Sequence, residues 1–203
     1  MTRQRGLNGL VLLGGLSSRM GMDKGSLVYP PSTGNVRGAE QRRRCFDLLE
    51  LVCEKTFVSC RAEKASEHAN DFPVITDSVR GEGPGAGILS AAKQFPEAAW
   101  LVLACDFPFA DEEAVGFLAK HRSHERPATV YAEDLHLIEP LFAIWEKPAL
   151  EELAKGFEAG DWSPRRALER VDQRLGCERL QPPVRRALVN VNSPEDSRAH
   201  GLS

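Results

Sequence analysis

The chain has 203 residues, enough for one sizeable hydrophobic core, and we expect a single domain over residues 1–203. Hydrophobic residues at 42% and charged residues at 27% argue against a disordered or fibrous protein, and no apolar run reaches the ~20 residues of a membrane span. The net charge of −3 argues against a general nucleic-acid binder, because such proteins need many cations to displace counterions from the phosphate backbone.

Strand and helix patterns alternate along the chain. Continuous apolar runs that end at turn residues predict strands, and apolar residues at helical spacing predict helices. In chain order, we expect strands at residues 7–13, 56–60, 72–76, 100–105, 129–131, 141–145 and 188–191, and helices at residues 40–52, 87–94, 112–120, 146–157 and 163 to about 171. Residues 28–38, rich in Pro, Gly, Ser and Thr, are expected to form a mobile surface loop.

The alternation of strands and helices predicts a three-layer domain with a mostly parallel sheet, joined by right-handed crossovers. Ligands of such sheets bind outside the carboxyl ends of the strands, so the polar residues directly after strands are the candidates for a site. These segments are GGLSSRMGMDK at 14–24, Ser59-Cys60-Arg61, Asp77-Ser78 and Cys105-Asp106-Phe107-Pro108.

The first of these segments has the composition of a phosphate loop. Gly14 and Gly15 let backbone N–H groups approach an anion, while Arg19 and Lys24 supply cationic donors for a polyphosphate. The alternative is an ordinary strand-to-helix turn with exposed charges. The loop lacks the GxGxxG spacing of dinucleotide sites, and the chain has no GxxxxGK[ST], so neither an NAD(P) site nor a P-loop is expected.

Asp106 follows a buried strand and precedes the turn that Pro108 enforces, which places one carboxylate at the ligand edge. Magnesium is usually held by one or two carboxylates together with substrate phosphates and water, so Asp106 is the predicted metal ligand. The alternative, that Asp106 caps the next helix, is less favoured because Asp111 is better placed as the cap.

Two further segments are candidates for contacts with the nucleotide. Residues 81–87, GEGPGAG, offer backbone groups near a ligand or else a flexible hinge, and Asp77 before them can accept from a base or sugar. Asn190 and Asn192 are expected on one face of a short strand, where both can bind a polar ligand or one can cap the following helix.

For the remaining charged residues and the cysteines, the sequence supports weaker predictions. Arg42 to Arg44 should face solvent, His121 and His124 should lie on a solvated surface without metal, and Arg165 or Arg166 is a candidate for a second phosphate. Five cysteines without a CxxC pair fit neither a disulfide framework nor a structural zinc site, which predicts a cytoplasmic location.

The chain resembles the molybdenum cofactor guanylyltransferases, or MobA-like nucleotidyltransferases. Their strand and loop, LAGGxSxRMGxDKxxL, is matched by LLGGLSSRMGMDKGSL at 12–27, and their GPLAG by GPGAG at 83–87. Their CDxP is matched at 105–108 and their NxNTPED at 190–196, so these motifs span residues 12–196.

The resemblance implies a nucleotide-diphospho-sugar transferase fold, a Rossmann-like α/β/α domain with a mixed, mostly parallel sheet. It implies GTP and molybdopterin as substrates, Mg²⁺ as cofactor, and transfer of GMP to the molybdopterin phosphate with release of pyrophosphate. We expect no nucleic-acid or membrane partner, a monomer or weak oligomer, and at most transient contact with other cofactor-biosynthesis proteins. By position in the motifs, the resemblance implies nucleotide contacts at Leu12, Leu13, Gly14, Lys24 and Asp77 and the metal ligand Asp106. Together with the residues argued above, the predicted substrate contacts are Leu12, Leu13, Gly14, Gly15, Lys24, Ser59, Asp77, Gly83, Pro84, Asn190 and Asn192, and the predicted catalytic residues are Arg19, Lys24 and Asp106.

Three departures from the family pattern bear on base selectivity. Leu13 replaces the usual alanine, Ser59 stands where an asparagine is common, and the loop after residue 28 lacks the usual GKP turn. A cytidylyltransferase or a sugar-phosphate nucleotidyltransferase of the same fold is therefore the alternative. A non-catalytic GTP-binding module is less favoured, because a sensor needs neither Lys24 nor Asp106. Asp23 receives no catalytic role.

Overall fold

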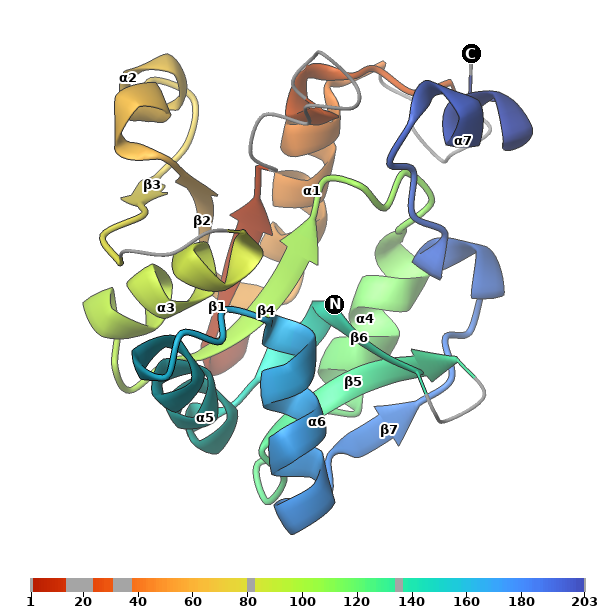
Figure 1. Ribbon diagram of the computed structural model, residues 1–203. Helices are drawn as coiled ribbons and strands as arrows, with labels where there is room; N and C mark the ends of the chain where they lie inside the picture. The colour runs from red at the N-terminus through yellow and green to blue at the C-terminus, as the bar shows by residue number, and fades with distance from the viewer. Residues whose placement is uncertain (1, 14–23, 31–37, 80–82, 134–136, 203) are drawn as a thin grey trace.

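A seven-stranded mixed sheet forms the centre of the protein (Figure 1). The computed structural model describes residues 2–13, 24–30, 38–79, 83–133 and 137–202. The strand order is β3-β2-β1-β4-β6-β5-β7. The strands are β1 (Gln4–Leu12), β2 (Cys53–Cys60), β3 (Val74–Thr76), β4 (Ala99–Ala104), β5 (Ala128–Glu133), β6 (Leu137–Trp145) and β7 (Glu178–Leu180).

The direction of the strands confirms the expected mostly parallel sheet. β1 lies between β2 and β4 and is parallel to both, β3 is parallel to β2, and β7 is parallel to β5. β6 alone runs antiparallel to its two neighbours, β4 and β5. The carboxyl ends of β1 to β4 therefore meet at one edge of the sheet, which is where ligands of such sheets bind.

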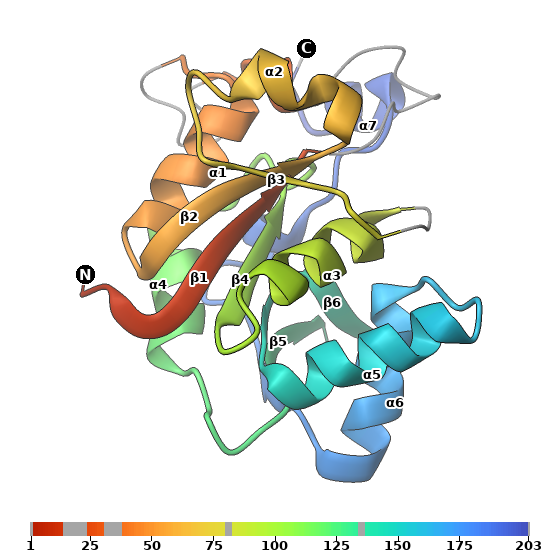
Figure 2. The ribbon, with the colours of Figure 1, turned by 90° about the vertical axis from the view of Figure 1, so that its left-hand side faces the viewer.

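Helices cover both faces of the sheet and complete the three layers (Figure 2). One face carries α1 (Gln41–Glu50) and α4 (Glu112–Lys120), and the other carries α3 (Pro84–Gln94), α5 (Lys147–Glu158) and α6 (Pro164–Leu175). The short helices are η1 (Lys24–Ser26), η3 (Ala62–Lys64), α2 (Ala65–His68), η4 (Arg185–Leu188) and α7 (Pro194–Ala199). In the part of the chain that the structure describes, no helix is long and apolar enough to cross a membrane.

Local sequence signals explain most of these boundaries. All six residues of β4 are buried, as expected for a continuous apolar run covered on both faces. The Asp111 carboxylate accepts a hydrogen bond from the Ala114 N–H at 2.8 Å, so Asp111 caps α4 as predicted. Ser163 caps α6 in the same way, with Pro164 at the first helical position.

The end of the chain differs from the expectation of a strand at residues 188–191. Residues 185–188 form η4, and residues 189–192 are irregular. The last strand is instead β7, whose three residues are all half-buried and carry no apolar pattern that sequence reasoning could detect. Val191 and the buried Tyr29, Phe109 and Leu202 form a separate small cluster, so the apolarity of Val191 reflects side-chain packing rather than membership of the sheet.

The start of α3 packs tightly against the turn between α5 and α6. A Cβ atom added at Gly85 would lie 2.8 Å from a ring carbon of Phe157 and 2.8 Å from the backbone oxygen of Trp162. Gly85 is therefore required for the approach of two helices, although the sequence motif suggested a ligand contact or a hinge.

We expect Gly85→Ala to lower the free energy of unfolding by about 1–3 kcal/mol, because overpacking outweighs the better helix propensity of alanine. Urea unfolding followed by circular dichroism measures this change. Adding Phe157→Leu removes the ring atoms but not the Trp162 carbonyl, so only part of the stability should return. A Gly85→Ala protein as stable as the wild type would contradict this packing.

Candidate active site

The carboxyl ends of β1, β2 and β4 are in register. Leu12 pairs with Ser59 on one side and with Ala104 on the other. Beyond the strands, the Leu13 N–H donates to the Ser59 carbonyl at 3.3 Å, and the Cys105 N–H donates to the Leu12 carbonyl at 3.2 Å. The predicted residues Leu12, Leu13 and Ser59 are therefore brought together, and Asp106 follows directly on the next strand.

Ser59 and Asp77 form a polar pair at the end of β2 and β3. The Ser59 hydroxyl donates to Oδ1 of Asp77 at 3.0 Å, and the Asp77 N–H donates to the Cys60 carbonyl at 3.0 Å. Burial raises the pKa of Asp77, and the hydrogen bond from Ser59 offsets part of that rise. Ser59 thus orients a half-buried carboxylate that can accept hydrogen bonds from a nucleoside.

The GPGAG motif is the first turn of α3 and not a loop. Gly83 has φ +81°, which favours glycine, and it is the residue before the helix. A Cβ at Gly87 would lie 2.3 Å from Oγ of Ser59 and 3.3 Å from Oδ1 of Asp77. The N-terminal end of α3, whose dipole favours an anion, therefore begins beside the Ser59–Asp77 pair.

Ser90 ties α3 to the segment after β3 and was not singled out in the sequence. Its hydroxyl accepts from the Ser78 N–H at 2.9 Å and donates to the Ala86 carbonyl at 2.8 Å. An internal serine in an apolar helix gives no local signal for this role, because its partner Ser78 lies twelve residues away.

Hydrogen bonds to three of its backbone carbonyls hold the loop that carries Asp106. The Val191 N–H donates to the Asp106 carbonyl at 2.9 Å, and Nε2 of the fully buried Gln41 donates to the Phe107 carbonyl at 3.0 Å. Nη2 of Arg44 donates to the Ala110 carbonyl. α1 and the C-terminal segment thereby fix the backbone of the loop that carries the half-buried Asp106.

One expectation for the α1 region is wrong, and a second is tested only at the ends of its segment. Arg44 was expected in solvent, yet it is only 8% exposed, because its guanidinium bonds the Ala110 carbonyl under the loop. The segment 28–38 was expected to be mobile, but its described ends are fastened: Val28 pairs with Glu40, and Tyr29 is buried. Burial, with a smaller effect of Asp106, raises the pKa of Tyr29 to about 12. Residues 31–37 lie outside the described part.

The asparagines near the C-terminus do not share a strand face. Asn190 and Asn192 are both exposed and flank the buried Val191 in an irregular segment. The Asn192 N–H donates to Oδ2 of Asp196 at 2.9 Å, and Ser193 and Asp196 form a capping box for α7. The segment reaches the edge of the sheet through the hydrogen bond from Val191 to Asp106, which places both asparagines near the loop after β4.

Part of the predicted phosphate loop lies outside the described residues. This applies to Gly14, Gly15, Arg19 and Asp23. For Lys24 the description covers the backbone, at the start of η1, and not the side chain. Their assignments stay predictions from the sequence.

Glu139, which was not a candidate from the sequence, lies near Asp106 and Arg165. Half-buried Glu139, near the start of β6, accepts a hydrogen bond from the Leu141 N–H at 2.9 Å. Burial raises the pKa of Glu139, the charge of Arg165 lowers it, and the charge of Asp106 raises it. The three side chains are therefore close enough to interact, although Glu139 stands before Pro140 in an apolar strand that carries no motif.

The raised pKa of Glu139 predicts a pH dependence of stability. The folded protein holds this proton above the ordinary pKa of 4.5, so the unfolded state binds fewer protons over that range. Relative to Glu139→Gln, the wild type should therefore lose stability as the pH rises from 4.5 through the raised pKa. Urea unfolding of both proteins across this range isolates the effect. A stability difference that is constant with pH would contradict it.

Residues 9–175 match the family model described as the MobA-like NTP transferase domain. The chain belongs to this family. Its MobA-like relatives include a molybdenum cofactor guanylyltransferase of Ectopseudomonas mendocina, 30% identical over 96% of this chain and 91% of the relative.

Two further comparisons extend this likeness. A molybdenum cofactor biosynthesis bifunctional protein of Synechocystis is 31% identical over 95% of this chain, which spans only 53% of that relative's length. The crystal structure of molybdopterin-guanine dinucleotide biosynthesis protein A from Archaeoglobus fulgidus superposes with a TM-score of 0.73 at 24% identity, over 95% of each chain. The fold expected from the sequence motifs is confirmed.

Proposed function

We propose that this protein is a molybdenum cofactor guanylyltransferase that transfers GMP from GTP to the phosphate of molybdopterin. The observation that carries the proposal is the assembly of Leu12, Leu13, Ser59, Asp77 and Asp106 at one edge of the sheet in a MobA-like chain. Relatives named for this activity, about 30% identical over most of the chain, support it.

The transfer requires no covalent enzyme intermediate. An oxygen of the acceptor phosphate attacks the α-phosphorus of GTP in line, a new P–O bond forms, and the bond to the leaving pyrophosphate breaks. Such reactions depend on positioning and on neutralising charge. The Ser59–Asp77 pair and the first turn of α3 hold the nucleotide, while Arg19 and Lys24 are assigned to the pyrophosphate from the sequence motif.

Asp106 is the proposed ligand of Mg²⁺, and its surroundings suit this metal. A half-buried carboxylate on a loop fixed through Gln41 and Val191 is a hard oxygen donor held in place. Among the described residues no cluster of three His, Cys, Asp or Glu side chains could enclose a metal, which fits an ion bound mainly by phosphates and water. When bound, Mg²⁺ would supply positive charge to the α-phosphate oxygens.

Release of pyrophosphate tests the proposal directly. The purified protein is incubated with molybdopterin and either GTP, CTP or ATP, and pyrophosphate is measured with an enzyme-coupled assay. We expect release with GTP that depends on both molybdopterin and Mg²⁺. Release with CTP alone would make the protein a cytidylyltransferase, and GTP binding without release would make it a non-catalytic module. Either result would refute the proposal.

A further inference from the structure

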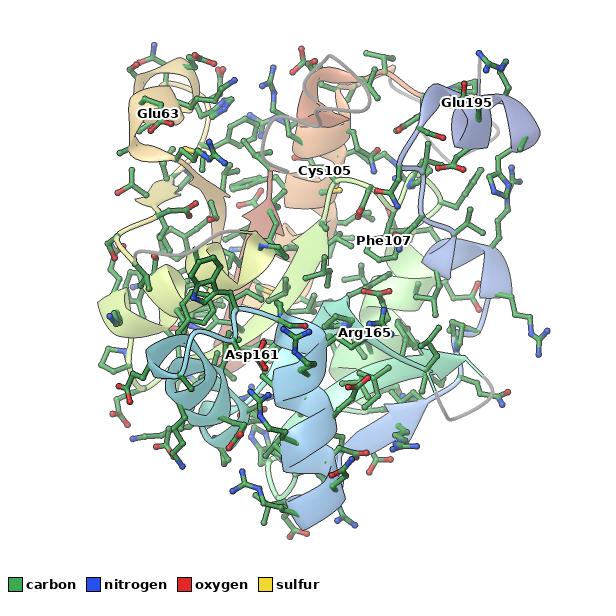
Figure 3. The ribbon with its side chains drawn as sticks, in the orientation of Figure 1. Glu63, Cys105, Phe107, Asp161, Arg165 and Glu195 are labelled. Carbon is green, nitrogen blue, oxygen red and sulfur yellow. The ribbon has the colours of Figure 1, made fainter. Side chains whose placement is uncertain are left out.

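Two neighbouring arginines at the start of α6 have different surroundings. Arg166 is exposed and donates from Nε and Nη2 to the Asp161 carboxylate, at 2.5 to 3.0 Å. Arg165 is half-buried, and its Nη1 is buried without a hydrogen-bond partner among the described residues. Figure 3 shows Arg165 on the side of α6 toward Phe107, and Asp161 on the side toward α5. Only Arg165 is therefore turned toward the loop after β4.

The unsatisfied nitrogen of Arg165 points to a ligand. A buried N–H without an acceptor costs about 1–3 kcal/mol, and native structures rarely leave such a group unused. An anionic oxygen removes this cost, and the planar guanidinium fits two oxygens of one phosphate. The residue thus has the chemistry of a phosphate contact, whereas Arg166 is already occupied by Asp161.

The charges around Arg165 restrict which anion it can bind. Glu139 interacts electrostatically with both Arg165 and Asp106, so two carboxylates from β6 and the β4 loop lie near the guanidinium. These carboxylates would repel a free anion, and a cation bound at Asp106 would reduce that repulsion. An anion that shares the proposed metal site with the nucleotide is therefore favoured over a free one.

The order of the strands separates the two halves of the site. The Ser59–Asp77 pair follows β2 and β3, Asp106 follows β4, and Glu139 lies on β6, in the spatial order β3-β2-β1-β4-β6. Asp106 therefore lies between the proposed nucleoside contacts and the Glu139–Arg165 pair. A transfer reaction needs a donor on one side of the reacting phosphorus and an acceptor on the other.

We infer that Arg165 binds the phosphomonoester of the acceptor, on the side of Asp106 opposite the nucleoside. The identity of the acceptor rests on the proposed function, but the anion site itself does not. Arg165 is the group that contacts the acceptor phosphate.

Steady-state kinetics with Arg165→Gln, and with Arg166→Gln as the matched control, test this role. We expect Arg165→Gln to raise the KM for molybdopterin about ten- to a hundredfold, with the KM for GTP near that of the wild type. Arg165→Lys keeps the positive charge but cannot donate to two phosphate oxygens at once, so it should restore only part of the affinity for molybdopterin. Arg166→Gln should change neither constant. If Arg165→Gln raises the KM for GTP and not for molybdopterin, the arginine serves the nucleotide and the inference is wrong.

A binding measurement without turnover separates this inference from the proposed function. Equilibrium dialysis of inorganic phosphate is done with Mg²⁺ and saturating GTP present but without an acceptor, so that the nucleotide side of the site is filled and no turnover occurs. Phosphate should bind to the wild type and to Arg166→Gln, and this binding should be lost in Arg165→Gln. Equal binding in all three would overturn the inference. If molybdopterin is no substrate of the wild type, the proposed function fails, and the phosphate measurement still decides the role of Arg165. Thermal unfolding checks that the variants fold. If Arg165→Gln does not fold, Arg165→Lys is measured instead, and phosphate binding by Arg165→Lys as strong as in the wild type would overturn the inference.

Discussion

Replacing Asp106 by asparagine should lower kcat with GTP and molybdopterin about 10²- to 10³-fold, the loss typical of a charge contact that strengthens in the transition state. Asparagine has the same shape as aspartate but carries no charge, so the loop should keep its hydrogen bonds from Val191 and Gln41. The lost charge weakens the proposed Mg²⁺ site next to the α-phosphate, and the effect should appear in kcat more than in the KM for GTP.

Asp111→Asn is the matched control for this variant. Asp111 lies five residues further along the same loop and caps α4, a role that asparagine fills equally well. We expect this protein to keep wild-type activity and wild-type stability. Pyrophosphate release as a function of Mg²⁺ concentration measures both variants. Near-normal magnesium-dependent turnover by Asp106→Asn would show that the metal is held elsewhere.

Gly87→Ala should weaken GTP binding about tenfold and lower the free energy of unfolding by about 1–3 kcal/mol. The added Cβ would lie 2.3 Å from Oγ of Ser59, so the hydroxyl must rotate away from the Asp77 carboxylate it now holds. Asp77 then loses its orientation toward the nucleoside. Titration with a fluorescent GTP analogue and urea unfolding measure the two effects.

A double-mutant cycle with Ser59→Ala identifies the cause. Removing the Ser59 hydroxyl takes away the shortest contact of the new Cβ and leaves Leu12 and Asp77 at 3.2 and 3.3 Å. The stability cost of Gly87→Ala should therefore shrink in the Ser59→Ala background, with a coupling energy of at least about 0.5 kcal/mol. Additive effects of the two substitutions would mean that the glycine serves another purpose, such as approach to the ligand itself.

Structural features whose deciding signal is local could be predicted from the sequence. The buried run at β4, the cap at Asp111 and the Ser163-Pro164 helix start each depend on neighbouring residues, and all three are confirmed. The strand at 188–191 and the solvent position of Arg44 were wrong for the opposite reason. In both cases a partner distant in sequence decides where the residue lies. Val191 packs with Phe109 and Tyr29, and the Arg44 guanidinium donates to the Ala110 carbonyl, 66 residues further along the chain.

By itself, the sequence determined the class of fold, the family and the segments that can carry chemistry, because periodicity, turn residues and ordered motifs are written in short stretches of chain. Only the tertiary structure decided how those segments cooperate. It showed that Gly85 and Gly87 are required by packing, that Gln41 and Arg44 hold the Asp106 loop, and that Arg165 rather than Arg166 faces the site. These outcomes depend on distances between residues far apart in the chain, which folding sets and local patterns do not encode.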